Sequence, residues 1–142
     1  MAIHFFQEDI QFNLKEKLKT KKWLKQLALE EGYTVGNLNY IFCSDEYLHD
    51  INMDYLDHDT YTDIITFDNS ERDHHLEGDI FISIERIEEN ARIQKTNFLD
   101  ELLRVLSRGL YHLCGYKDKL EREITVMRSK EDYAIMKFKS FN

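Results

Sequence analysis

Alternating strand-like and helix-like segments constrain the fold of this chain more than any other feature. Short runs of apolar, β-branched and aromatic residues predict four strands, at residues 3–6, 38–43, 63–67 and 78–83. Apolar residues at helical spacing predict five helices, at residues 20–31, 45–56, 98–113 and 121–139 and after Ser83. The order β-α-β-α-β-β-α-α-α predicts an α/β or α+β fold, with helices packed on a small mixed sheet.

The length and charge of the chain limit its domain count and its partners. With 142 residues it is long enough for one core, so residues 1–142 are expected to form a single domain. A formal net charge of −8 argues against gross electrostatic attachment to nucleic acid or to an anionic membrane, so any RNA contact must be local. No apolar run approaches the roughly 18 residues that span a bilayer, and no secretory signal is present. We therefore expect a cytoplasmic protein, with Cys43 and Cys114 as buried free thiols.

The segment from Arg108 to Asp118 is the most informative about chemistry. Positions 108 and 112 lie about 40° apart around a helix, so Arg108 and His112 are expected on one face. Gly115 lets the chain turn and bring Asp118 back toward them. Zinc sites are often built from ligands on one helix face and in the turn that follows. Alternatively, His112 is an ordinary helix histidine, Gly115 a C-cap and Asp118 the cap of the next helix.

The same segment resembles the signature of the YbeY family of metal-dependent endoribonucleases, His-Gly-x-Leu-His-Leu-x-Gly-Tyr-Asp-His. The chain keeps five of the nine specified positions, which are Gly109, His112, Leu113, Gly115 and Tyr116. Residues 52–67 resemble the family's Asn-x-x-Tyr-Arg-x-x-Asp-x-Pro-Thr-Asp-Val-Leu-Ser-Phe, and residues 78–83 match its Gly-Asp-Ile-x-Ile-Ser. The segments occur in the family's order.

This resemblance implies a fold, a metal and a reaction. The implied fold is a sheet of about four strands packed with about five helices, a zincin-like metal-hydrolase architecture. One zinc ion is implied, with ligand positions 108, 112 and 118, so His112 and Asp118 are the expected metal ligands. The implied activity is single-strand-specific RNA cleavage in maturation of the 3′ end of small-subunit rRNA and in ribosome quality control. Expected partners are rRNA, the small ribosomal subunit and ribosome-associated proteins.

Two positions depart from the family pattern in a way that affects the chemistry. Arg108 stands at a metal-ligand position, although a guanidinium has no free lone pair and repels a divalent cation. Leu56 stands where the family has an Arg near the active site, a residue expected to contact RNA phosphate or to stabilise developing negative charge. One hypothesis is that Arg108 supplies this missing cation and acts as a catalytic residue, leaving a two-ligand metal site or none. Asp118 is tolerable as a ligand, because a carboxylate oxygen binds zinc at about the imidazole distance.

Three interpretations of the function follow. The leading one is a metal-dependent endoribonuclease, in which zinc polarises a water for phosphodiester hydrolysis. The alternative, which Arg108 favours, is a catalytically weakened family member that binds the ribosome or a partner protein without cleaving RNA. The third is that Arg108 is peculiar to this sequence and that the natural protein carries His there.

Other charged residues have both a functional and a structural interpretation. Asp79 is either an outer-shell residue of the metal site or a structural carboxylate at a strand edge. His58 precedes the third predicted strand and could approach the site. A basic run could receive RNA phosphates or form a solvated helix face, and it comprises Lys15, Lys17, Lys19, Lys21, Lys22 and Lys25.

Overall fold

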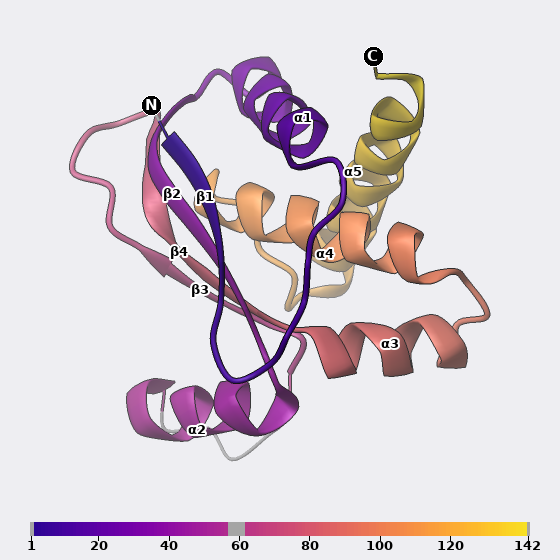
Figure 1. The fold of residues 1–142 in the computed structure, drawn as a ribbon. Helices are drawn as coiled ribbons and strands as arrows, with labels where there is room; N and C mark the ends of the chain where they lie inside the picture. The colour runs from indigo at the N-terminus through magenta and orange to yellow at the C-terminus, as the bar shows by residue number, and fades with distance from the viewer. Residues whose placement is uncertain (1, 57–61, 142) are drawn as a thin grey trace.

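The computed structural model describes residues 2–56 and 62–141. Its strands are β1 (Ala2–Gln7), β2 (Thr34–Cys43), β3 (Ile64–Asp68) and β4 (His75–Ser83). Its helices are α1 (Lys17–Glu30), α2 (Asp45–Leu56), α3 (Ile84–Ile93), α4 (Phe98–Leu113) and α5 (Glu121–Ser140). The predicted order of elements is confirmed (Figure 1).

The four strands form one mixed sheet in the order β1-β2-β4-β3. β1 and β4 each pair in parallel with β2, whereas β3 pairs antiparallel with β4 along the sheet edge. The parallel pairs require crossover connections, which the segments containing α1 and α2 provide. The prediction of a small mixed sheet with helices is therefore correct.

Helices cover both faces of the sheet, but unequally. The main core joins the sheet to α1, α3, α4 and α5, and its largest fully buried side chain is Trp23. A smaller cluster of Cys43, Leu48 and Ile65 lies under α2 on the other face. Figure 1 shows α2 apart from the four helices that gather on the opposite side. No helix in the described chain is long and apolar enough to cross a membrane.

Several boundaries differ from the sequence-based expectation. α1 begins at Lys17 rather than at residue 20, because Leu18, the one apolar residue before Thr20 in this helix, is exposed and does not belong to the apolar stripe. β2 begins at Thr34 rather than at residue 38, since an irregular register between Val35 and Leu38 interrupts the alternating pattern. β3 ends at residue 68 rather than 67, and β4 begins at His75 rather than at residue 78, so the connection between these two strands is shorter than the predicted strand bounds imply.

Close packing fixes α4 against the sheet. The Tyr40 hydroxyl donates a hydrogen bond to the Leu106 carbonyl over 3.0 Å, which joins β2 to α4. Gly109 allows the approach, because a Cβ there would lie 2.9 Å from Ile80 Cγ2 and 3.0 Å from Ile64 Cδ1. The helix is thereby held next to the start of β3, where Asp63 lies.

Candidate active site

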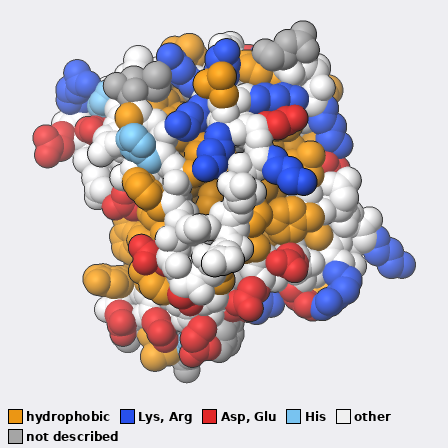
Figure 2. Space-filling model, viewed as in Figure 1, with side chains coloured by type: hydrophobic (Ala, Val, Ile, Leu, Met, Phe, Trp, Pro, Cys, Tyr) orange, Lys and Arg blue, Asp and Glu red, His pale blue; other side chains and the backbone are white. Residues whose placement is uncertain are grey.

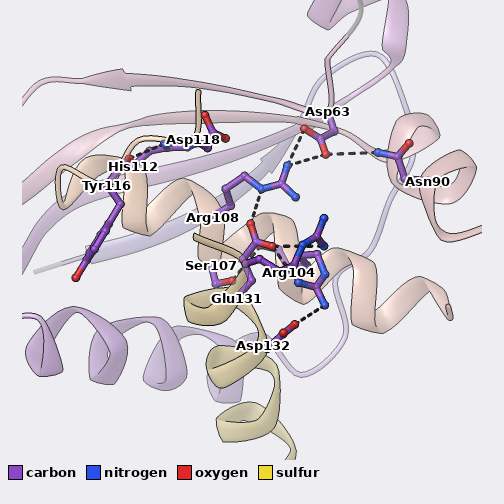
Figure 3. A network of polar contacts seen from close by, with 11 residues as sticks. Asp63, Asn90, Arg104, Ser107, Arg108, His112, Tyr116, Asp118, Glu131 and Asp132 are labelled. Carbon is purple, nitrogen blue, oxygen red and sulfur yellow. Dashed lines mark hydrogen bonds and ion pairs between the residues drawn. The ribbon is translucent and has the colours of Figure 1, made fainter. Parts of the chain in front are cut away.

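α4 presents a row of polar side chains on one side. Arg104, Arg108 and His112 follow one another at intervals of four residues, the spacing that places side chains on one helix face. Figure 3 shows Arg108 between Asp63, which precedes β3, and Glu131, which belongs to α5. The expectation that positions 108 and 112 share a helix face is confirmed.

Arg108 is held by two carboxylates. Its Nε donates to Glu131 Oε2 over 2.7 Å, and its Nη1 donates to both oxygens of Asp63 over 3.0 and 3.2 Å. Burial alone lowers the pKa of the guanidinium, but the charges and hydrogen bonds of Asp63 and Glu131 outweigh that effect and raise it. Arg108 is therefore a permanent cation that ties α4 to α5 and to the sheet.

The network extends along α4 and α5. Glu131 is 2% exposed and also accepts from Arg104 Nη1 over 3.0 Å, while Arg104 Nη2 donates to Asp132 over 2.8 Å. Glu101 is 1% exposed, and its Oε1 has no hydrogen-bond partner among the described residues. Burial raises the pKa of Glu101 despite the opposing effect of Arg108.

His112 and Asp118 form a second pair at the C-terminal end of α4. Gly115 adopts a φ of 102°, and the chain turns so that Asp118 Oδ2 lies 3.3 Å from His112 Nε2. His112 Nδ1 lies 2.9 Å from the Tyr116 carbonyl oxygen, which can only accept, so Nδ1 carries the proton. In the neutral imidazole the lone pair of Nε2 is therefore directed toward the Asp118 side.

A small pocket is lined by residues of both the Arg108 network and the His112–Asp118 pair. It has a volume of about 220 Å³ and is lined by Arg108, Asp118, Ile124, Met127, Arg128 and Glu131. The first half of α5 thus contributes to the wall of the pocket that Arg108 and Asp118 also line. The pocket is open to solvent and bears groups of both charges.

The residues present fit a metal site with two protein donors. His112 offers an imidazole nitrogen whose other nitrogen is bonded to a carbonyl, the usual outer-shell arrangement of a metal-ligating His. Asp118 offers a carboxylate oxygen beside it. Arg108 takes the third position and donates no lone pair. Within residues 2–56 and 62–141, no three His, Cys, Asp or Glu side chains are grouped to hold a metal ion.

The other sequence-based expectations have mixed outcomes. Asp118 does not cap α5, because Leu120 is the N-cap and its backbone N–H is bonded by Glu123. Asp79 accepts from Asn39 over 2.9 Å, a pairing between neighbouring strands.

Cys43 is buried as expected but Cys114 is partly exposed, and burial raises the pKa of both thiols to about 12. His58 lies outside the described residues.

Three residues of the network were not singled out as functional from the sequence. Asp63 lies within the family-like segment at residues 52–67, so that resemblance carried a signal for it. Glu131 and Glu101 belong to helices rich in charge, and nothing local distinguishes them from solvated residues. Their importance arises only when α4 and α5 pack together.

Fold and site together define a small α+β protein in which α4 carries a partly buried arginine and a histidine that pairs with an aspartate in the following turn. Residues 2–139 match the family model described as Endoribonuclease YbeY. The Endoribonuclease YbeY of Cytophaga hutchinsonii is 55% identical over 134 residues, which cover 94% of each chain. That of Christiangramia forsetii is 48% identical, covering 96% of this chain and 94% of the relative. This chain belongs to the YbeY family of endoribonucleases.

A solved structure shares this fold. The solution structure of TM1509 from Thermotoga maritima superposes with a TM-score of 0.67 at 26% identity, covering 96% of this chain and 89% of that one. The alternative of a family member that binds without cutting gains no support, because the family and these two relatives carry the description endoribonuclease.

Proposed function

We propose that the chain is a metal-dependent endoribonuclease that hydrolyses phosphodiester bonds of single-stranded RNA. Its membership of the family, together with the His112–Asp118 pair at the family signature, is the observation that supports this best. The substrate is rRNA of the small ribosomal subunit, cut during maturation of its 3′ end and in ribosome quality control. Residues 1–142 act as one domain in the cytoplasm, with ribosome-associated proteins as further partners.

His112 and Asp118 are the proposed metal ligands, and zinc is the proposed metal. Imidazole nitrogen and carboxylate oxygen are both ligands that zinc accepts, and its remaining positions stay open to water or RNA. When bound, zinc supplies Lewis-acid polarisation of water and phosphate. The hydrogen bond from His112 Nδ1 to the Tyr116 carbonyl orients the imidazole for this role.

Arg108 is the proposed catalytic cation. Its Nε and Nη1 are used by Glu131 and Asp63, but among the described residues its Nη2 makes no hydrogen bond. The side chain lines the pocket that also contains Asp118. Nη2 therefore offers a charged donor for an RNA phosphate beside the metal ligands.

The activity is tested with a fluorescent single-stranded RNA oligonucleotide. We expect the purified protein to cleave it, EDTA to abolish cleavage and added zinc to restore it. His112→Ala should lower the rate at least about 100-fold, the upper range for loss of even an outer-shell partner. His4→Ala, at an exposed position on β1, is the matched control and should cleave normally. Full activity of His112→Ala would contradict the proposal.

The identity of the metal is tested by mass spectrometry of the purified protein. We expect zinc in the unmodified chain, and tighter binding in Arg108→His because it adds a third donor. His112→Ala and Asp118→Ala should both lose the metal. Zinc found only in Arg108→His would show that two ligands do not suffice and would overturn the assignment.

A further inference from the structure

We infer that Arg128 binds a backbone phosphate of the RNA in the pocket it shares with Arg108 and Asp118. The inference rests on the proposed function, since it assigns part of the RNA contact at the same site. It concerns a residue of α5, outside the family-like motifs at residues 52–67, 78–83 and 108–118.

The first support is the position of Arg128. Arg128 lines the pocket of about 220 Å³ that is also lined by Arg108 and Asp118. Asp118 in turn lies 3.3 Å from His112. A phosphate held by Arg128 would therefore lie in the same pocket as Asp118, one of the two proposed metal ligands.

The second support is the availability of the guanidinium. The Arg128 side chain is 48% exposed, and its ion pair with Glu131 is long, at 3.8 Å. Glu131 already receives shorter bonds from Arg104, at 3.0 Å, and from Arg108, at 2.7 Å. Little therefore holds Arg128 to Glu131, and its planar fork of donors is free to turn toward a phosphate, which it matches bidentately.

The third support is the local need for positive charge. The chain has a formal net charge of −8, and the pocket itself contains the carboxylates of Asp118 and Glu131. The Arg108 side chain is 16% exposed and shares its charge with two carboxylates, so a phosphate in the pocket needs a second cation, which Arg128 supplies.

The test is a binding measurement that does not depend on cleavage. The probe is a fluorescein-labelled 2′-O-methyl oligouridylate of about ten nucleotides, followed by fluorescence anisotropy at several salt concentrations. We expect Arg128→Ala to raise Kd about 10-fold and to reduce the slope of log K against log salt by about 0.7, the value for one phosphate contact on a single strand. Arg128→Lys should keep the slope and lose part of the affinity, because it keeps the charge but not the fork.

Arg122→Ala is the matched control. Arg122 is also an exposed arginine of α5, but it lines a different pocket, with Gly115 and Val126. It should change neither Kd nor slope, and circular dichroism should show both variants folded. Equal effects of Arg122→Ala and Arg128→Ala, or no effect of Arg128→Ala, would overturn the inference. The two proposals can fail separately. If the unmodified protein does not cleave RNA but Arg128→Ala still weakens binding of the oligonucleotide, the proposed function is contradicted and this inference stands.

Discussion

At the scale of single residues, the site is a balance of buried charges. Three carboxylates of low exposure, Asp63, Glu101 and Glu131, face the guanidinium groups of Arg104 and Arg108. The carboxylates outnumber the arginines by one, and Glu101 is the one whose Oε1 has no hydrogen-bond partner among the described residues. Removing its charge would leave Asp63 and Glu131 matched by the two arginines. The raised pKa of Glu101 is consistent with this count.

Glu101→Gln should change how stability depends on pH. Because the pKa of Glu101 is raised from 4.5 on folding, its protonated form favours the folded state. The stability that it contributes is complete below pH 4.5 and is lost as the pH rises through the folded-state pKa. The Gln variant cannot ionise, so its free energy of unfolding should exceed that of the unmodified protein increasingly over this range.

Urea denaturation at a series of pH values measures this difference. Glu121→Gln, at an exposed position in the first turn of α5, is the control and should follow the pH profile of the unmodified protein. If Glu101→Gln were less stable than the unmodified protein at neutral pH, Glu101 would instead be a stabilising carboxylate.

At the scale of secondary-structure elements, the contacts of α4 decide where the site forms. One side of α4 packs on the sheet through Gly109, and another meets α5 through the Arg108–Glu131 pair. Trp23 of α1 donates a hydrogen bond to the Ala134 carbonyl over 2.8 Å and so joins α5 to α1. The site therefore depends on how closely α4 approaches β3 and β4.

Gly109→Ala should weaken the site by forcing α4 away from the sheet. The added methyl would meet Ile80 and Ile64, and the β-branched Ile80 has little freedom to move aside. Overpacking costs about 1–3 kcal/mol, whereas the better helix propensity of Ala returns about 1 kcal/mol. We expect a net loss of up to about 2 kcal/mol in urea denaturation and slower RNA cleavage, because Arg108 separates from Asp63. The control is Leu99→Ala, at an exposed position on α4, which should change neither the stability nor the rate of cleavage. Normal stability and normal cleavage in Gly109→Ala would refute this account.

At the scale of the whole molecule, charge is unevenly distributed. Lysine and arginine side chains gather over α1 in Figure 2, while acidic side chains gather over α2. Within the described chain, Lys19 is the member of the basic run that forms an ion pair, with Glu16. The other lysines of the run, at positions 15, 17, 21, 22 and 25, have no carboxylate partner among residues 2–56 and 62–141, and they produce a local positive field on an acidic protein.

Reversing the charge of the basic run should weaken binding to the small ribosomal subunit without slowing RNA cleavage. A variant with Lys17, Lys21, Lys22 and Lys25 changed to Glu should bind small ribosomal subunits more weakly, as measured by co-sedimentation at low salt. Cleavage of a short RNA oligonucleotide should be unchanged, because the oligonucleotide needs only the pocket beside α5.

The control carries the same total charge elsewhere. It changes four exposed cations outside α1 to Glu, namely Arg72, Arg92, Lys95 and Lys119. It should bind small subunits more strongly than the α1 variant does. Equal binding of the two variants would show that the basic run is a solvated helix face, the structural interpretation of its sequence.

The sequence by itself determined the features whose signals are local. The bounds of α4 were predicted to the residue, because an apolar stripe runs along it and Gly115 follows its end. The structure adds that the Asn97 side chain caps its start. The His112–Asp118 pair was also predictable, since a single turn of chain brings these residues together.

Only the tertiary structure decided what surrounds Arg108. Asp63 and Glu131 lie 45 and 23 residues from it along the chain, and they meet it because β3, α4 and α5 pack together. The early start of β2 could not be predicted either, since its first residue, Thr34, pairs with His75, which is 41 positions away along the chain. Such pairings depend on close packing between distant segments, and no local pattern of residues encodes them.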